Sequence, residues 1–337
     1  MKISRRQFVK AMAAMSAASM LAACGGSSDS GSSGGKKALT FQIWDVAQKE
    51  GMEAMCAAYT QQHPEVSIEV QVTSWNEYWT KLEAAATSNQ MPDIFWMHTN
   101  ELLKYADNGM LADCSDIVEK DKFSEVSLSN AMGSNGTLYA VPKDKDTVGL
   151  VYNKEMFDAA GVAYPDENWT WDDLVSASEK IYAATGKYGY MAYADDQLGY
   201  WNFVYQAGGY ILNEDKTKAG FTQPATEKAM KFYIGLQQND WCPDQTYFAE
   251  TAPGTAFFSE KGAMFLEGDW NILAELQNYP EMVGKWDVAV LPKCPDPESG
   301  DGRATISNGL CYATAANNKN LDTVKDVLKF FGSEEGQ

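Results

Sequence analysis

Tryptophans that stand next to polar side chains follow several of the strands that this 337-residue sequence predicts. An indole ring offers a flat apolar face, and Asp, Asn or His side chains beside it offer hydrogen bonds. A pyranose needs both, because its C–H face stacks on a ring while its hydroxyls bind polar groups. The candidate residues are Trp44, Asp45, Trp75, Trp96, His98, Asp144, Asp146, Trp201, Asn202, Asp269, Trp270 and Asn308.

Strands and helices alternate along the chain, a pattern typical of an α/β protein whose mostly parallel sheets are flanked by helices. In open sheets, ligands bind at the carboxyl ends of strands and between domains, which is where the candidate residues lie. Ser74 to Glu77 has the form of a capping box and predicts a helix to about residue 89, and Thr170 to Asp173 caps a second predicted helix that ends at Gly186. Strands are predicted at 39–44, 66–72, 94–97, 138–141, 148–152, 188–193, 264–266, 286–291 and 306–313, with 286–291 and its Trp286 buried.

Residues 139–154 separate two bodies of the chain. Two apolar, strand-like runs flank Pro142 and the charged sequence Lys-Asp-Lys-Asp at 143–146. A proline has no backbone N–H to donate to a neighbouring strand, and four consecutive charges are costly to bury. The segment is therefore expected to run through solvent from one body to the other as a hinge strand. Asn308 lies in the segment that is predicted to lead the chain back from the second body to the first. We therefore expect a first lobe at 38–143 plus 308–337 and a second lobe at 144–307.

The amino terminus has the features of an export signal. Four basic residues within the first ten precede an apolar stretch at 11–23, which is shorter than the ~20 residues needed to span a bilayer. Leu21-Ala-Ala-Cys24 resembles a lipobox, so residues 1–24 are expected to be a signal peptide and Cys24 the lipidated first residue of the mature chain. Residues 25–37, rich in Gly and Ser, predict a flexible tether. Twin-arginine export and general export both fit residues 4–10.

Four segments in order carry a resemblance to a known family. They are Tyr139 to Lys154, Asn168-Trp-Thr-Trp-Asp-Asp-Leu174, Gly262-Ala-Met-Phe-Leu-Glu-Gly-Asp-Trp270, and Lys329-Phe-Phe-Gly-Ser-Glu-Glu-Gly-Gln337. Together they resemble the family 1 extracellular solute-binding proteins, which are the sugar-capturing lipoproteins of ABC importers. The resemblance covers essentially the whole chain after residue 38.

The resemblance implies a periplasmic-binding-protein-like fold of two lobes joined by hinge strands. It also implies a monomer that binds a mono- or oligosaccharide between the lobes, closes about the hinge and delivers the sugar to an ABC permease. Such a protein is anchored by lipid to the outer face of the cytoplasmic membrane. Trp270 matches the family's Gly-x-Trp ligand-stacking position. Family members usually continue beyond a segment like 333–337, so a further part of the second lobe is expected to be missing.

Composition excludes several other classes of protein. The net charge is −19, and it becomes −23 without the four basic residues of 1–23. Such acidity argues against nucleic-acid binding, which needs a basic surface. No phosphate-binding loop or cofactor motif is present. The remaining cysteines have scattered spacings that predict isolated buried thiols rather than disulfides or a metal site, and they are Cys56, Cys114, Cys242, Cys294 and Cys311.

An enzyme is the alternative that the sequence leaves open. The chain has only His63 and His98, and it lacks a Gly-x-Ser-x-Gly nucleophile motif. Acidic pairs could act as glycosidase carboxylates or bind calcium, or they could be solvated charges of the hinge and loops. These pairs are Asp144 with Asp146 and Asp195 with Asp196. A binding protein without catalysis, cofactor or metal is therefore weighed against a lipid-anchored glycan-active hydrolase with cleft carboxylates.

Overall fold

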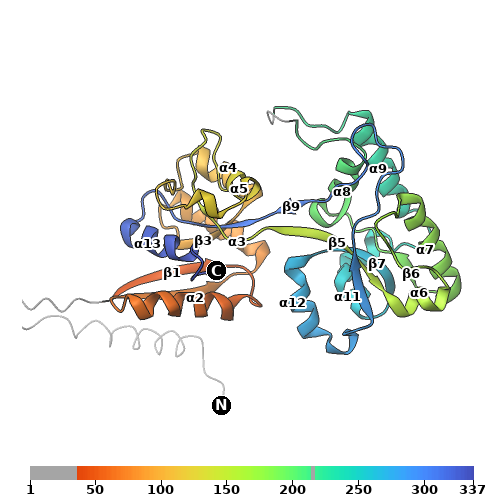
Figure 1. Cartoon of the computed structure of the whole chain (residues 1–337), viewed down its shortest axis with the longest axis horizontal. Helices are drawn as coiled ribbons and strands as arrows, with labels where there is room; N and C mark the ends of the chain where they lie inside the picture. Colours follow the sequence, from red (N-terminus) through yellow and green to blue (C-terminus); the bar gives the residue numbers. More distant parts are fainter. Residues whose placement is uncertain (1–35, 214–216) are drawn as a thin grey trace, which may run out of the picture. The chain divides into compact units, whose positions relative to one another are not determined.

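The computed structural model describes residues 36–213 and 217–337. Residues 38–337 form one compact unit. It contains two five-stranded sheets with helices packed around them, as an α/β protein should (Figure 1). The predicted signal peptide, the predicted lipidation site Cys24 and most of the predicted tether lie outside the described residues.

The first sheet has the strand order β2-β1-β3-β10-β4 and, with its helices, forms the first lobe. Its strands are β1 (Lys37–Ile43), β2 (Val66–Val72), β3 (Ile94–His98), β4 (Val141–Pro142) and β10 (Leu310–Ala313). Its helices are α2 (Lys49–Gln62), α3 (Trp75–Thr87), α4 (Thr99–Asp107), η1 (Lys120–Lys122), α5 (Glu125–Asn130) and α13 (Leu321–Phe331). One hydrophobic core joins this sheet to these helices.

The second sheet has the order β6-β7-β5-β8, with β9 paired to β5, and builds the second lobe. Its strands are β5 (Asp146–Asn153), β6 (Tyr188–Tyr190), β7 (Gly262–Gly268), β8 (Trp286–Ala289) and β9 (Ser307–Asn308). The helical elements are α6 (Lys154–Ala160), α7 (Trp171–Thr185), η2 (Asp196–Tyr200), α8 (Trp201–Gln206), α9 (Pro224–Leu236), α10 (Gln245–Glu250), α11 (Pro253–Phe258), α12 (Asp269–Asn278) and η3 (Pro280–Met282). Two separate cores fill this lobe.

Two crossing strands join the lobes, one leading from β4 into β5 and the other from β9 into β10 (Figure 1). They run antiparallel, since Asp146 pairs with Asn308 at the start of β5 while β10 pairs with β4 in the first sheet. Pro142 lies in the edge strand β4, where its missing N–H costs no ladder bond on the open side. The two-lobed α/β fold with hinge strands is confirmed. The exact domain limits given above stay predictions.

The sheets are mixed rather than mostly parallel, so that part of the expectation is wrong. β1 pairs parallel with β3, and β6 pairs parallel with β7. The strands that continue from the crossings pair in the antiparallel direction. In the second sheet β5 runs antiparallel to both β7 and β8, and in the first sheet β10 runs antiparallel to both β3 and β4. A chain that leaves one sheet and later returns to it enters in the opposite direction, which the strand-helix alternation does not reveal.

Of the two expected helix caps, one forms. Thr170 and Asp173 make a complete capping box at the start of α7, which ends at Gly186 with φ of 67°. Ser74 precedes α3 but makes no side-chain capping bond. Glu77 instead accepts from Lys81 at 2.9 Å one turn along the exposed helix face, so the predicted box at Ser74 is wrong.

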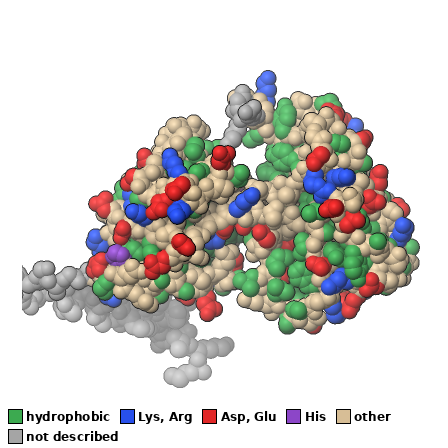
Figure 2. Space-filling model, in the orientation of Figure 1, with side chains coloured by type: hydrophobic (Ala, Val, Ile, Leu, Met, Phe, Trp, Pro, Cys, Tyr) green, Lys and Arg blue, Asp and Glu red, His purple; other side chains and the backbone are tan. Residues whose placement is uncertain are grey.

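Strand β8 is an edge strand, and the prediction that it is buried is also wrong. It pairs only with β5, and Val288 is 48% exposed. Trp286 is partly buried against the edge of the Phe258 ring, with ring centroids 5.6 Å apart. Figure 2 shows hydrophobic side chains gathered over the part of the second lobe that holds α11 and α12. Other exposed hydrophobic side chains near β8 and α12 are Leu273, Leu276, Val283 and Val290.

The thiol prediction is confirmed, because the five cysteines outside the predicted signal peptide are free and buried. Within residues 36–213 and 217–337, no group of three or more His, Cys, Asp or Glu side chains could hold a metal ion. No helix in the described part of the chain has the length and apolarity needed to cross a membrane.

Candidate ligand-binding site

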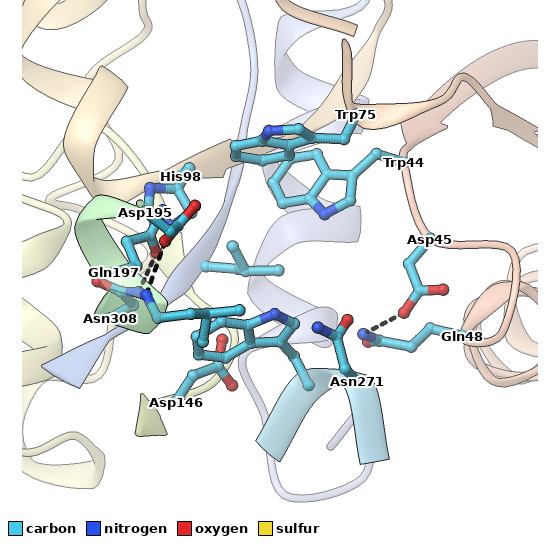
Figure 3. Close-up of a pocket in the computed structure, with 13 residues that line it drawn as sticks. Trp44, Asp45, Gln48, Trp75, His98, Asp146, Asp195, Gln197, Asn271 and Asn308 are labelled. Carbon is cyan, nitrogen blue, oxygen red and sulfur yellow. Dashed lines mark hydrogen bonds between the residues drawn. The ribbon is translucent and has the colours of Figure 1, made fainter. Parts of the chain in front are cut away.

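A cavity of about 380 Å³ lies where the two lobes and the two crossing strands meet (Figure 3). A cavity of this size falls within the range of small-molecule sites. Its lining residues are Trp44, Asp45, Gln48, Trp75, His98 and Leu310 from the first lobe, Asp146 and Asn308 from the crossings, and Asp195, Gln197, Leu198, Trp270 and Asn271 from the second lobe.

Two indoles form the first-lobe wall. Trp44 follows β1 and is held by edge-to-face contacts with the buried rings of Tyr78 and Trp96, whose centroids lie 4.9 and 5.0 Å away. Trp75 begins α3 and meets Trp44 edge-on at 5.1 Å. Trp75 is 41% exposed, so part of its ring is available to a ligand. Figure 3 shows both rings on the same side of the cavity.

His98 is a neutral hydrogen-bond donor at this wall. Its Nδ1 accepts from the backbone N–H of Asn100 at 3.2 Å, capping α4. An accepting Nδ1 places the ring proton on Nε2. Burial lowers the pKa of His98 to about 4, against an opposing effect of Asp144. The imidazole is therefore uncharged at neutral pH.

Trp270 supplies a wall from the second lobe, and Gly268 makes room for it. A Cβ atom on Gly268 would lie 2.3 Å from three atoms of the Trp270 ring. Only glycine therefore allows the indole to lie against the end of β7. This contact is a physical reason for the spacing of Gly268 and Trp270 in the sequence.

A side-chain network fixes the turn that precedes α8 beside the cavity. Asn202, fully buried in α8, donates to the carbonyls of Gln197 and Gly199 at 2.7 and 3.2 Å and accepts from the backbone N–H of Ile306 at 2.8 Å. The Gln197 side chain in turn accepts from the Asn308 amide. The turn is thereby held to the return crossing, with Gln197 and Asn308 at the cavity (Figure 3).

Asp146 is a carboxyl group with an unusual protonation equilibrium. Burial raises its pKa to about 7, and the neighbouring charges of Asp144 and Asp269 act in the same direction, while Lys143 opposes them. A partly protonated carboxyl can both donate to and accept from a ligand hydroxyl. Such a group suits a polyhydroxylated ligand.

Asp195 and Asp45 add two further carboxyl groups. Asp195 accepts from the backbone N–H of Leu198 at 2.7 Å, and burial raises its pKa. Asp45 accepts from Ala47 N–H at 2.8 Å and from the Gln48 amide at 2.9 Å. Among the residues of 36–213 and 217–337 that line the cavity there is no lysine or arginine. An anionic ligand would therefore meet only like charge there.

Seven of the twelve residues expected at the site line this cavity. They are Trp44, Asp45, Trp75, His98, Asp146, Trp270 and Asn308. Their location agrees with the expectation, while their role in binding stays a prediction.

The structure places the other five elsewhere. Trp96 is fully buried under Trp44 in the first core, because both faces of β3 are covered. Asn202 is internal, as described above. Trp201 packs against the second-lobe core. Asp144 accepts from the backbone N–H of Leu310 at 2.8 Å, and Asp269 accepts from that of Thr147 at 3.1 Å. Both carboxylates therefore bind the backbone of the two chain segments that cross between the lobes.

Six lining residues were not among the predicted site residues, and they are Gln48, Asp195, Gln197, Leu198, Asn271 and Leu310. For two of them, a neighbouring predicted site residue in the sequence could have indicated a place at the site. Asn271 immediately follows the expected Trp270, and Gln48 lies three residues after the expected Asp45. The sequence pattern indicates Asp195 only as half of an acidic pair with Asp196.

The chain matches the bacterial extracellular solute-binding protein family over residues 44–337. It belongs to that family. The diacetylchitobiose binding protein DasA of Streptomyces coelicolor is 25% identical over 346 residues, covering 97% of this chain and 78% of the relative. The arabinooligosaccharide-binding protein of Bacillus subtilis is 27% identical over 335 residues, covering 94% and 74%.

Solved structures show the same fold. An ABC substrate-binding protein from Listeria monocytogenes, in complex with cycloalternan, aligns with a TM-score of 0.78 at 24% identity and covers 89% of this chain and 76% of its own. The cyclic alpha-maltosyl-1,6-maltose binding protein from Arthrobacter globiformis aligns with a TM-score of 0.71 at 26% identity, with coverage of 89% and 76%.

Proposed function

We propose that this protein binds a mono- or oligosaccharide in the cavity between its lobes. The observation that carries the proposal is the placement of indole rings on both lobes, Trp44 and Trp75 on one and Trp270 on the other, around shared carboxyl and amide groups. A sugar held between such walls would stack its C–H faces and bind its hydroxyls at the edges. Relatives named for diacetylchitobiose and arabino-oligosaccharide binding support the same class of ligand.

We further propose that the bound sugar passes to an ABC permease after the lobes close about the crossing strands. The membership in the solute-binding family and the hinge-like arrangement of β5 and β9 support this step. Lipid attachment at Cys24 would keep the protein at the outer face of the cytoplasmic membrane. Stable attachment usually needs more than one acyl chain, and a multiply acylated cysteine supplies them.

A thermal-shift screen tests the binding proposal. The panel is diacetylchitobiose, an arabino-oligosaccharide, lactose, maltotriose, glucose and glucuronate. At 100 times its dissociation constant, a ligand adds about 2.7 kcal/mol to the free energy of unfolding, which raises the melting temperature. At least one neutral sugar should do so, and glucuronate should not. No shift with any member would contradict the proposal.

Hydrolysis is the second candidate function, favoured only by the carboxyl groups Asp45, Asp146 and Asp195 at the cavity. Incubation of the chain with the binding saccharide, followed by chromatography of the sugar, separates the two. A binding protein returns the saccharide intact. Cleavage that disappears in Asp146→Asn would establish the hydrolase instead.

A further inference from the structure

Two amide side chains point toward the cavity, Gln48 from the position just before α2 and Asn271 from α12 (Figure 3). An amide can present either its carbonyl oxygen or its N–H groups to a ligand, and its hydrogen-bonding partners on the protein side decide which. Each of these amides is bonded to an ionisable residue that does not line the cavity. Those partners have opposite charge.

Lys143 holds Gln48. Its Nζ donates to Gln48 Oε1 at 2.9 Å, pairs with Asp144, and lies 4.8 Å from the centroid of the buried Trp96 ring. The Lys143 side chain is only 9% exposed. An ammonium can only donate, so the Gln48 oxygen must face Lys143. The Gln48 Nε2 is thereby turned toward Asp45, to which it donates at 2.9 Å, and toward the cavity.

Glu267 holds Asn271 from the second lobe. Its Oε1 accepts from the Asn271 Nδ2 and from the backbone N–H of Gly268, both at 2.8 Å. Glu267 is 5% exposed, and burial raises its pKa to about 7. The charged groups that face it are Glu275 on α12 and Asp195 before η2. An ionised carboxylate can only accept, so the Asn271 N–H group must face Glu267 and its oxygen is left for the cavity.

We propose that Lys143 and Glu267 are positioning residues that set the hydrogen-bond polarity of the site. Lys143 makes Gln48 a donor, and Glu267 makes Asn271 an acceptor. The inference rests on the proposed function and adds to it a pattern for the ligand, which must offer an oxygen acceptor to Gln48 and a hydroxyl donor to Asn271. Protonation of Glu267 removes the negative charge that favours this orientation of Asn271.

The first test needs no ligand. In the full chain labelled with ¹⁵N-glutamine, the Gln48 side-chain signals are assigned by their loss in Gln48→Ala. Lys143→Met should shift these signals, whereas Lys145→Met, which removes the same charge from an exposed residue of the same crossing, should leave them in place. If Lys143→Met fails to fold, Lys143→Gln replaces it. Unchanged Gln48 signals in the Lys143 variant, or equal shifts in both variants, would overturn the assignment.

The second test follows the Asn271 side-chain signals against pH, with assignment by Asn271→Ala. They should titrate with a midpoint near pH 7. Glu267→Gln should abolish the titration, and Glu281→Gln, at an exposed position of η3, should preserve it. A flat profile in the unmodified chain, or a titration that survives in Glu267→Gln, would overturn the role of Glu267.

The dissociation constant of the saccharide tests whether Lys143 acts on binding. For the panel saccharide with the largest thermal shift, Lys143→Met should raise the dissociation constant about tenfold, a change of about 1.4 kcal/mol. Lys145→Met should leave it unchanged, and a change of equal size in both variants would contradict the positioning role. If no panel saccharide binds, the proposed function fails, while the two spectroscopic tests still decide the amide orientations.

Discussion

Asp146 and Asn308 are backbone partners in the antiparallel pair formed by the two crossing strands, and both side chains line the cavity. The candidate site therefore includes the hinge itself as well as the two lobes that the hinge joins. A ligand that contacts Asp146 and Asn308 would remain bound to the same pair while the indoles of either lobe approach it. We propose that closure occurs about this pair.

Gly268→Ala should weaken saccharide binding by displacing Trp270. The new methyl group would collide with the indole, whose ring atoms lie 2.3 Å from the Cβ position. Gly51→Ala is the matched control, because nothing lies within 4 Å of a Cβ at this helical position. That control should bind normally and gain about 0.4 to 1 kcal/mol of stability. Equal dissociation constants for the two variants in calorimetric titration would contradict the role of Gly268.

The stability of the protein should depend on pH through Glu267. Its pKa rises from 4.5 to about 7 on folding, so the folded state holds the proton more tightly. The resulting stabilisation is present below pH 4.5 and is lost as the pH rises to 7. Glu267→Gln removes this contribution, while the contribution of Asp146, whose pKa burial also raises to about 7, remains in both forms of the chain. Relative to the unmodified chain, the variant should gain about 2 to 3 kcal/mol between pH 5 and pH 8.

Denaturant unfolding at both pH values measures that difference. Glu281→Gln should show no relative change, because its carboxyl is exposed. The same small difference at pH 5 and pH 8 for Glu267→Gln would show that Glu267 is not held in its protonated form by burial.

The five thiols of the fold should be unreactive in the native protein. Burial raises the pKa of Cys56, Cys114 and Cys242 to about 12, and it raises the pKa of Cys294 and Cys311 as well. A thiol reagent acts on the thiolate, which is scarce at such pKa values. In a Cys24→Ser variant, less than one thiol per chain should react at pH 8, and five should react in guanidinium. Rapid reaction without denaturant would contradict this burial.

Cys24→Ser should also release the protein from membranes. Without the acylated cysteine, the chain would lose the anchor proposed for it. Fractionation of cells that express either form measures the result, with Cys242→Ser as a control that changes a buried cysteine. Membrane retention of Cys24→Ser would contradict lipid attachment at this position.

Local signals predicted much of the fold. The box formed by Thr170 and Asp173 and the terminal Gly186 gave the limits of α7, because caps depend on neighbouring residues alone. Strand direction and edge position could not be read in the same way. Residues 286–291 are largely apolar, yet the exposure of β8 depends on its single partner β5.

The pairing of tryptophans with neighbouring polar residues predicted much of the site, both at the ends of strands (Trp44, His98) and at helix starts (Trp75, Trp270). Trp44 and Trp96 both fitted the pattern, but every residue of β3 is buried, so nothing in the sequence showed that Trp96 faces the core. Gln48 and Asn271 lie at helix starts in different lobes. That both line one cavity depends on how the crossing strands place the two lobes, which local sequence does not indicate. The pairing of each amide with a buried charge likewise arises only in the folded chain.

Calorimetric titration of the unmodified chain and of Trp270→Ala, with the saccharide that gives the largest thermal shift, tests the central claim most directly. The unmodified chain should bind one saccharide per molecule. Trp270→Ala should lose about 2 kcal/mol of binding free energy, as expected for an aromatic anchor, and any lower melting temperature reflects the loss of its packing against the second-lobe core. Trp286→Ala, outside the cavity, should keep the original affinity. Unchanged affinity in Trp270→Ala would contradict saccharide binding between these walls.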